Sequence, residues 1–209
     1  MLNNSSARAF AANFVDPVAK VALRAGISPD VVTLIGTAAT CAAALMCFPA
    51  QRWFLGALLI AVFVSFDLLD GTMARMSGRS GPWGAFLDST LDRVADGAIF
   101  GGMLLGFARQ GDLRTAGVAL ACLIGGSVVS YAKARAESIG VECNVGIAER
   151  AERVMLALGA AALYGLGVPF ILPVALWILA ILSWVTVAQR IIHVRSALQG
   201  RSSQSTDES

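Results

Sequence analysis

The chain has 209 residues, of which 56% are hydrophobic and only 14% are charged. Soluble domains are roughly 45–50% apolar and about 25% charged, so this composition excludes a disordered protein, a coiled coil and an ordinary soluble enzyme. The net charge of +2 does not indicate nucleic acid as a partner. A membrane span needs about 20 apolar residues, so the length leaves room for about six spans. We predict one all-α integral membrane protein.

An amphipathic segment opens the chain at residues 5–25. The polar residues before it lack the apolar core of a secretory signal. Apolar residues then recur near helical spacing among basic ones, at Phe10, Phe14, Val18 and Val21. This pattern is typical of a helix that lies in the membrane interface. We therefore assign residues 1–26 to an N-terminal interfacial helix.

Six apolar segments of spanning length follow the interfacial helix. They run over 29–48, 53–75, 83–108, 113–137, 148–166 and 168–195. Ser28 and Pro29 have the chemistry of an N-cap and a first helical residue, which indicates where the first span begins. We assign residues 27–198 to a six-span domain and residues 199–209 to a disordered, cytoplasmic tail.

The basic residues are distributed unequally between the two sides that six spans would create. Thirteen of the 16 fall on the side of the termini, whereas only Arg52, Arg109 and Arg114 fall on the other. Positive residues favour the cytoplasmic side of a membrane. The bias predicts a multi-pass protein of the cell (plasma) membrane with both termini in the cytoplasm.

Five carboxylates lie within the second and third apolar segments, at Asp67, Asp70, Asp88, Asp92 and Asp96. A charge at mid-bilayer costs at least about 2.5–3.5 kcal/mol, so several of them require a compensating role. Separations of three and four residues place each of the first two pairs on one helix face. At 1.5 Å per residue, the first four converge at similar depth near the cytoplasmic side. Asp96 lies one turn deeper, and we expect it to be a structural carboxylate.

Four converging carboxylates repel one another unless cations neutralise them. Oxygen ligands suit Mg²⁺ or Mn²⁺ better than zinc, and four of them suit two ions. A two-metal site stabilises the attacking and leaving oxygens of a phosphoryl displacement. Small residues at Gly71, Ala74 and Gly84 would let a bulky ligand approach the backbone, and Arg75 could reach its phosphate oxygens.

These residues form a recognisable pattern. Asp67-x-x-Asp70-Gly71-x-x-Ala74-Arg75, eight residues, then Gly84-x-x-x-Asp88-x-x-x-Asp92 resembles the signature of the CDP-alcohol phosphotransferase family at all eight fixed positions. The family's architecture, an interfacial helix and six spans, would cover almost the whole chain. The resemblance implies an enzyme that moves a phosphatidyl group from CDP-diacylglycerol, a membrane lipid, to an alcohol, with CMP as the leaving group.

The resemblance also implies roles for individual residues. Asp67, Asp70, Asp88 and Asp92 would hold two divalent ions, Mg²⁺ or Mn²⁺, and Asp92 would also be the general base. Gly71, Ala74, Arg75 and Gly84 would shape the CDP-diacylglycerol site. The start of the first span is similar to the family segment that reaches the nucleotide, which would add Asp30 and Thr33. Helix capping alone accounts for Ser28 and Pro29 but leaves the roles of Asp30 and Thr33 open.

A second basic group follows the carboxylates on the same side of the membrane, and several converging cations suggest a phosphorylated acceptor. These segments are similar to those of actinobacterial family members that bind inositol phosphate. On that resemblance, inositol 1-phosphate is the acceptor and its phosphate is bound by Ser130, Lys133, Arg135, Arg153 and Arg190. Topology alone also places Lys and Arg at such span ends. Arg150 could face lipid headgroups instead.

Other interpretations stay open at this point. The closest alternative is phosphatidylglycerol phosphate synthesis, with glycerol 3-phosphate as the acceptor on the same metal site. An intramembrane prenyltransferase is a remote alternative, because its aspartate-rich motifs lie on well-separated helices of longer chains, whereas here both lie within 67–92. A cation transporter is a second remote alternative, since it would not require the Gly-x-x-Ala-Arg element. Small residues at Gly97, Gly101, Gly102 and Gly106 predict a helix-packing face, either within the subunit or at the seam of the homodimer that is usual in the family.

Overall fold

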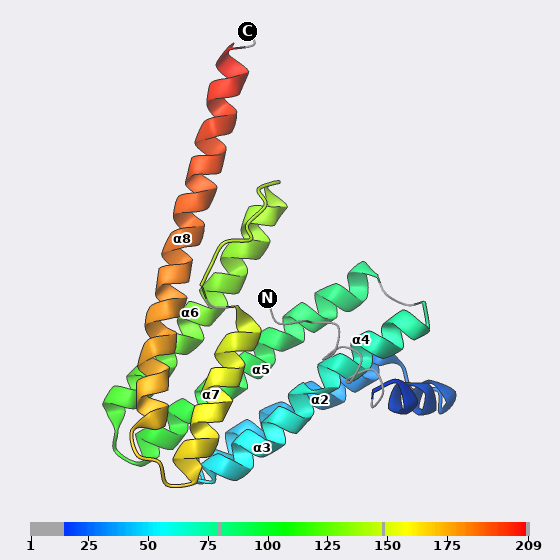
Figure 1. The fold of residues 1–209 in the computed structure, drawn as a ribbon, viewed down its shortest axis with the longest axis vertical. Coiled ribbons are helices and arrows are strands. Elements are labelled where there is room, and N and C mark those ends of the chain that lie inside the picture. Colours follow the sequence, from blue (N-terminus) through cyan, green and yellow to red (C-terminus); the bar gives the residue numbers. More distant parts are fainter. Residues whose placement is uncertain (1–14, 79–80, 148, 208–209) are drawn as a thin grey trace, which may run out of the picture.

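The computed structural model describes residues 15–78, 81–147 and 149–207, with only the backbone described for Asp67 and residues 200–207. Within this part of the chain the regular structure is α-helical throughout, with no strand (Figure 1). A helical segment at residues 15–24 comes first. The helices that follow are α2 (Pro29–Cys47), α3 (Trp53–Val64), α4 (Phe66–Met76), α5 (Pro82–Arg109), α6 (Leu113–Ser138), α7 (Arg150–Gly165) and α8 (Ile171–Asp207).

Four stretches among the described residues are long and apolar enough to cross a membrane. They are Pro29–Cys47, Trp53–Met76, Leu113–Ser138 and Ile171–Gln199. The predicted third and fifth spans correspond to the helices α5 and α7. Neither of these helices is both long and apolar enough to be counted among the four stretches. α5 carries Asp88, Asp92, Arg93 and Asp96, and these charges offset its apolar residues. α7 has only 16 residues. The chain is therefore a multi-pass membrane protein of the all-α class.

The predicted second span is broken into α3 and α4 at Ser65. The Ser65 hydroxyl donates to the carbonyl of Ala61 at 2.8 Å. Such back-bonding by serine bends helices because it competes with the backbone ladder. After the break α4 packs against α2, where Gly36 leaves room for Phe66. α4 therefore continues along α2 and reaches its first turns.

The packing of α5 on α2 and on the start of α3 depends on two of the glycines. A Cβ atom at Gly102 would lie 2.5 Å from the Ala44 carbonyl oxygen, and one at Gly106 would lie 2.6 Å from the Trp53 ring. This half of the small-residue face therefore packs within the subunit. At Gly97 and Gly101 a Cβ would meet no atom within 4 Å.

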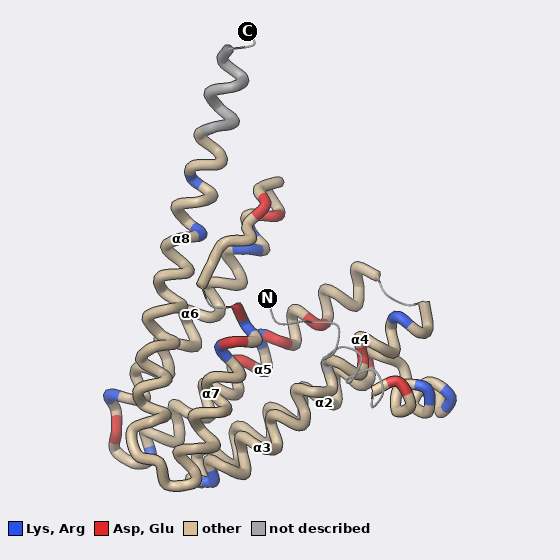
Figure 2. The backbone as a smooth tube through the Cα atoms, viewed as in Figure 1, with Lys and Arg blue, Asp and Glu red and all other residues tan. Residues whose placement is uncertain are grey.

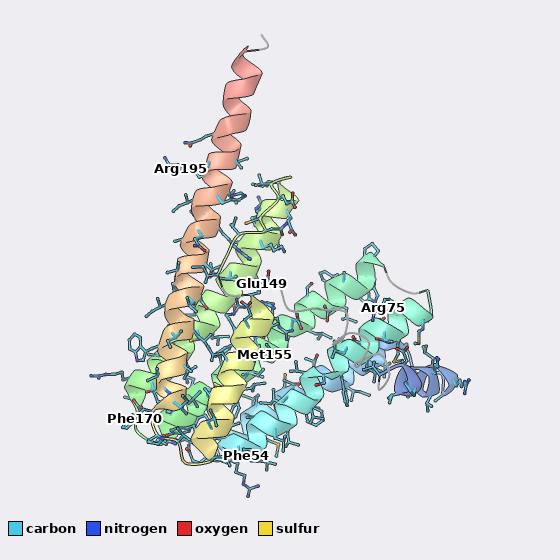
Figure 3. All side chains as sticks on the ribbon, in the orientation of Figure 1. Phe54, Arg75, Glu149, Met155, Phe170 and Arg195 are labelled. Carbon is cyan, nitrogen blue, oxygen red and sulfur yellow. The ribbon has the colours of Figure 1, made fainter. Side chains whose placement is uncertain are left out.

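The helices converge at one end of the molecule and diverge at the other (Figure 1). α6 runs beside α8, while α2, α3 and α5 lean away from them. Phe54 and Phe170 lie at the converging end, and Arg75 and Arg195 lie toward the other (Figure 3). The loops of Arg52 and Arg109 meet at the converging end, where Arg109 donates to the Pro49 carbonyl.

Both ends of the chain were assigned from sequence. Helix is present at 15–24, where Ala19 is buried against Val32 and Met73 while Val18 and Val21 are exposed. Phe10 and Phe14, predicted to continue this helix, lie outside the described residues.

At the other end, α8 continues to Asp207 through most of the stretch that the sequence predicted to be disordered, 199–209. Extending a helix that is already formed needs no new nucleus, because each further residue adds one hydrogen bond. Polar composition alone therefore did not mark the end of this helix.

Candidate active site

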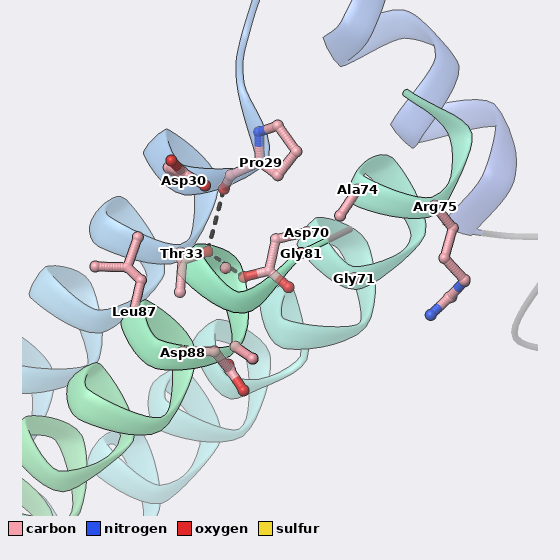
Figure 4. Close-up of a pocket in the computed structure, with 12 residues that line it drawn as sticks. Pro29, Asp30, Thr33, Asp70, Gly71, Ala74, Arg75, Gly81, Leu87 and Asp88 are labelled. Atoms are coloured by element: carbon pink, nitrogen blue, oxygen red, sulfur yellow. Dashed lines mark hydrogen bonds between the residues drawn. The ribbon is translucent and has the colours of Figure 1, made fainter. Parts of the chain in front are cut away.

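A pocket of about 310 Å³ lies between α2, α4 and α5, near the diverging end. We call it the carboxylate pocket; Figure 4 shows it in close-up. Eight residues singled out in the sequence line it together, namely Asp30, Thr33, Asp70, Gly71, Ala74, Arg75, Gly84 and Asp88. Residues of α2, α4 and α5 share this pocket, and the two halves of the motif meet in it through Asp70 and Asp88.

Thr33 and Asp70 connect α2 to α4 inside this pocket. Both side chains are buried, and the Thr33 hydroxyl oxygen lies 2.5 Å from Asp70 Oδ2 and 3.1 Å from the Pro29 carbonyl oxygen. Asp30 is at the rim and accepts a hydrogen bond from the Trp83 indole at 3.0 Å. Ser28 caps α2 as predicted. Asp30 and Thr33 are thus lining residues, and Trp83 is a neighbour that the sequence analysis did not identify.

The small residues leave space where the motif requires it. A Cβ at Gly84 would meet no atom within 4 Å, and one at Gly71 would meet only the Arg75 guanidinium, at 3.6 Å. Arg75 is exposed and donates to Thr72 Oγ1 at 2.9 Å on its own helix. The backbone of α4 is therefore accessible from the pocket, with a cation beside it.

The carboxylates divide into two environments. Asp70 and Asp88 reach the carboxylate pocket from facing helices (Figure 4). Asp92, one turn beyond Asp88, accepts from Arg150 Nη1 at 2.7 Å. Asp67 lies one turn before Asp70, but its side chain is outside the described residues.

The donor set fits a hard divalent cation, since carboxylate oxygens from two helices face one space. Among the described side chains, which omit Asp67, no three carboxylate, histidine or cysteine groups lie close enough to hold an ion. The predicted four-carboxylate site therefore stays a prediction.

A second pocket of about 620 Å³ lies between α5, α6, α7 and α8; we call it the cationic pocket. Ser130, Lys133, Arg153 and Arg190, predicted to bind an acceptor phosphate, line it. Arg135 does not; it is exposed and donates to Ser138 at the end of α6. Its position two residues after Lys133 turns it to another side of the helix, because residues two apart do not share a face.

Two arginines of the cationic pocket are held by the fold. Arg153 is 2% exposed and packs on Gly126, where a Cβ would lie 3.5 Å from its guanidinium. Arg190 is 7% exposed and donates to the carbonyls of Val145 at 2.9 Å and Val129 at 2.5 Å. Arg190 thereby ties the loop after α6 to α6 and α8, and part of its donor capacity serves the fold.

Arg93 and Arg150 also line the cationic pocket, and the sequence analysis had not placed them there. Arg93 donates to Ser130 and lies 3.5 Å from Asp96, while Arg150 Nε lies 3.1 Å from Asp96 Oδ1. Asp96 is 7% exposed, so its carboxylate is the structural one that was expected. A signal was present for Arg93, which is three residues before an intramembrane acid.

Comparison with known proteins decides the family. The sequence matches the model of the CDP-alcohol phosphatidyltransferase family over residues 26–191. The chain belongs to this family. The CDP-alcohol phosphatidyltransferase match includes both halves of the carboxylate motif and every lining residue of the two pockets named above.

Relatives within the CDP-alcohol phosphatidyltransferase family are similar over most of their length. The phosphatidylinositol phosphate synthase of Streptomyces avermitilis is 51% identical over 200 residues, covering 92% of this chain and 82% of the relative. That of Mycolicibacterium smegmatis is 46% identical, covering 87% and 83%.

Solved structures of Mycobacterium tuberculosis phosphatidylinositol phosphate synthase are similar to this fold. The one with CDP-DAG bound has a TM-score of 0.84 at 41% identity, covering 87% of this chain and 94% of that one. A second, in complex with manganese and citrate, has a TM-score of 0.84 at 42% identity, covering 87% and 88%.

Proposed function

We propose that this protein transfers a phosphatidyl group from CDP-diacylglycerol to inositol 1-phosphate, giving phosphatidylinositol phosphate and CMP. The observation that carries the proposal is the adjacency of the two pockets along α5, with Asp88 in one and Ser89 and Arg93 in the other. One pocket has carboxylates and small residues for a metal-bound diphosphate. The other has cations for the phosphate of an acceptor. The names of the relatives agree with this pair of substrates.

The carboxylate pocket would hold the cytidine diphosphate part of the donor. Gly71, Ala74 and Gly84 leave the backbone accessible, and Arg75 supplies a cation at the rim. Asp30 and Thr33 would complete this site from α2.

We further propose that Asp67, Asp70, Asp88 and Asp92 hold two Mg²⁺ or Mn²⁺ ions. Bound divalent ions would neutralise the charge that develops on the diphosphate oxygens. The manganese complex of a structural neighbour supports the use of a divalent metal. Thr33 would orient Asp70 through its hydroxyl, which lies against one carboxylate oxygen.

The reaction is a displacement at the phosphorus that carries the diacylglycerol. The acceptor hydroxyl oxygen forms a new bond to this phosphorus, and the bond from phosphorus to the CMP oxygen breaks. Asp92 would accept the hydroxyl proton, since it lies one turn beyond Asp88 of the carboxylate pocket and contacts Arg150 of the cationic pocket, and a base must be within hydrogen-bond reach. Ser130, Lys133, Arg153 and Arg190 would hold the acceptor phosphate.

The proposal includes an arrangement in the membrane. α5 and α7 would be spans in addition to the four apolar stretches, giving six, with residues 1–26 in the interface and both termini and the active site on the cytoplasmic side of the plasma membrane. The unequal distribution of basic residues supports this orientation. The protein would be a homodimer, for which the open face at Gly97 and Gly101 is available.

The acceptor can be identified with purified protein in vesicles that contain CDP-diacylglycerol and Mg²⁺. Radiolabelled inositol 1-phosphate and glycerol 3-phosphate are supplied in separate reactions, and label in the lipid fraction is measured with CMP release. We expect label to enter lipid from inositol 1-phosphate. Turnover of glycerol 3-phosphate alone would instead establish phosphatidylglycerol phosphate synthesis, and metal-independent turnover would contradict the proposed site.

A further inference from the structure

Arg150 connects the cationic pocket to Asp92, which lies one turn from Asp88 of the carboxylate pocket. It is the first residue of α7, its side chain lines the cationic pocket, and its guanidinium lies on two carboxylates of α5. Nη1 is 2.7 Å from Asp92 Oδ1, and Nε is 3.1 Å from Asp96 Oδ1. Figure 2 shows the acidic and basic residues of α5 and α7 together at this point.

The two carboxylates under Arg150 are not equivalent. Asp96 is more deeply buried and also lies 3.5 Å from Arg93, so it keeps a cation if Arg150 moves. Asp92 is 3.9 Å from Arg93, too far for a strong bond, so Arg150 is its principal described cationic partner. If the contact between Arg150 and Asp92 is broken, the Asp92 carboxylate can bind another cation. The contact with Asp96 still holds Arg150 in place.

Each member of the ion pair between Arg150 and Asp92 could instead bind a ligand of opposite charge. A divalent ion at Asp92 would compete with the guanidinium for the same carboxylate. A phosphate in the cationic pocket would compete with Asp92 for the guanidinium, with bidentate geometry available. Binding of either the divalent ion or the phosphate breaks the ion pair, and this favours binding of the other. The two binding affinities are then coupled, and the coupling is equal in both directions by thermodynamic necessity.

We propose that Arg150 is a positioning residue that couples the two pockets: it neutralises Asp92 while the cationic pocket holds no phosphate, and turns to the acceptor phosphate when it binds. Binding of the acceptor then leaves the Asp92 carboxylate to a divalent cation and to its role as base. This inference rests on the proposed function, because it takes the cationic pocket as the site of the acceptor phosphate.

The test measures Mn²⁺ binding by titration calorimetry on the full-length protein in detergent, without donor. Sulfate is the first probe, because it is a tetrahedral dianion that needs no recognition of an inositol ring; inositol 1-phosphate is the second. In the wild type, saturating sulfate is expected to tighten Mn²⁺ binding about tenfold. In Arg150→Gln, Mn²⁺ should bind that tightly without sulfate, and sulfate should add nothing.

Two further variants keep the test decisive. Arg150→Lys keeps a cation, and so the fold, but loses the bidentate fork, and we expect the sulfate effect to shrink at least severalfold. Arg114→Gln is the matched control, because it removes a cation from the start of α6, at the converging end of the molecule. In this variant sulfate should tighten Mn²⁺ binding as much as in the wild type. Mn²⁺ affinity that ignores both anions in the wild type, or that weakens in Arg150→Gln and Arg150→Lys, would overturn the coupling. Coupling to sulfate without turnover of inositol 1-phosphate would overturn only the acceptor assignment.

Discussion

The hydroxyl oxygen of Thr33 on α2 lies 2.5 Å from the carboxylate oxygen Oδ2 of Asp70 on α4. The two residues are 37 positions apart, and both are buried. The contact joins the first turns of one span to the helix that carries the first half of the carboxylate motif. A hydroxyl that donates to Asp70 leaves one carboxylate oxygen of this residue directed at the pocket.

Replacing Thr33 with valine tests this contact with little change in shape. Hydrogen bonds to charged groups contribute about 1.5–3 kcal/mol, so we expect kcat/KM for CDP-diacylglycerol to fall roughly tenfold to a hundredfold. Thr33→Ser keeps the hydroxyl and should retain most of the activity. Steady-state CMP release measures both variants, and equal losses in the two would mean that the methyl group, rather than the hydroxyl, matters.

Asp92→Asn removes the proposed base while it keeps the size of the side chain. A positioned general base contributes about a hundredfold to ten-thousandfold, so turnover with saturating substrates should fall roughly a hundredfold or more. Asp112→Asn makes the same change at the opposite end of the protein and should leave turnover unchanged. CMP release at saturating substrate is the measurement, and a wild-type rate in Asp92→Asn would remove this residue from the chemistry.

Lys133→Gln tests whether the acceptor and the donor bind in separate pockets. Lys133 lines the cationic pocket and forms a long ion pair with Glu137, at 3.8 Å, which contributes little to stability. We expect the KM for inositol 1-phosphate to rise about tenfold while the KM for CDP-diacylglycerol and the melting temperature stay the same. A rise in both Michaelis constants would contradict a separate acceptor site.

The glycines of α5 provide a matched pair for stability. Gly102→Ala forces a methyl group against the Ala44 carbonyl and should lower the free energy of unfolding by about 1–3 kcal/mol. Gly101→Ala meets no atom within 4 Å, and alanine favours a helix over glycine by up to about 1 kcal/mol, so it should be neutral or stabilising. Thermal unfolding in detergent compares the two; an equal loss in both would place another chain against Gly101.

The start of α6 has a pH-dependent cap outside the spans. Asp112 accepts from the Thr115 amide at 3.0 Å and from its hydroxyl at 2.6 Å, and these bonds lower the pKa of the Asp112 carboxyl. A lowered folded-state pKa gives stability that is complete above the unfolded-state pKa of about 4 and is lost as the pH falls through the folded-state value. Asp112→Ala should cost about 1 kcal/mol at pH 7.

The difference between wild type and Asp112→Ala should therefore shrink in acid. Thermal unfolding at pH 7 and at a series of values below 4 measures it. Asp112→Asn keeps an acceptor for the Thr115 amide and serves as the control for the charge. A difference that stays constant at all these pH values would mean that the cap acts without its charge.

Much of the site could be predicted because its signals are local. The spacing of Asp70, Gly71, Ala74 and Arg75 lies within one helix, and the second half of the motif follows after a short loop. Two helices joined by a short loop are neighbours, so their carboxylates meet without knowledge of any other contact. The same reasoning predicted Ser28 as the cap of α2.

The contacts that the arginine side chains make could not be predicted from such local signals. Arg135 and Lys133 are two residues apart, yet only Lys133 lines the cationic pocket. The place of Arg150 was left open between the acceptor pocket and lipid headgroups, and it pairs with acids more than 50 positions away. A long cationic side chain can reach several different partners from one backbone position. The packing of α7 near α5 decides which partner Arg150 contacts.

The sequence by itself therefore determined the membrane class, the start of α2 and the carboxylate motif, because apolar runs, caps and short spacings act within a few turns of one helix. Only the tertiary structure decided the break at Ser65, the internal packing of Gly102 and Gly106, and the ion pairs of Arg93 and Arg150. These features depend on which helices meet and at what depth, and a buried charge takes the partner that the packing offers it.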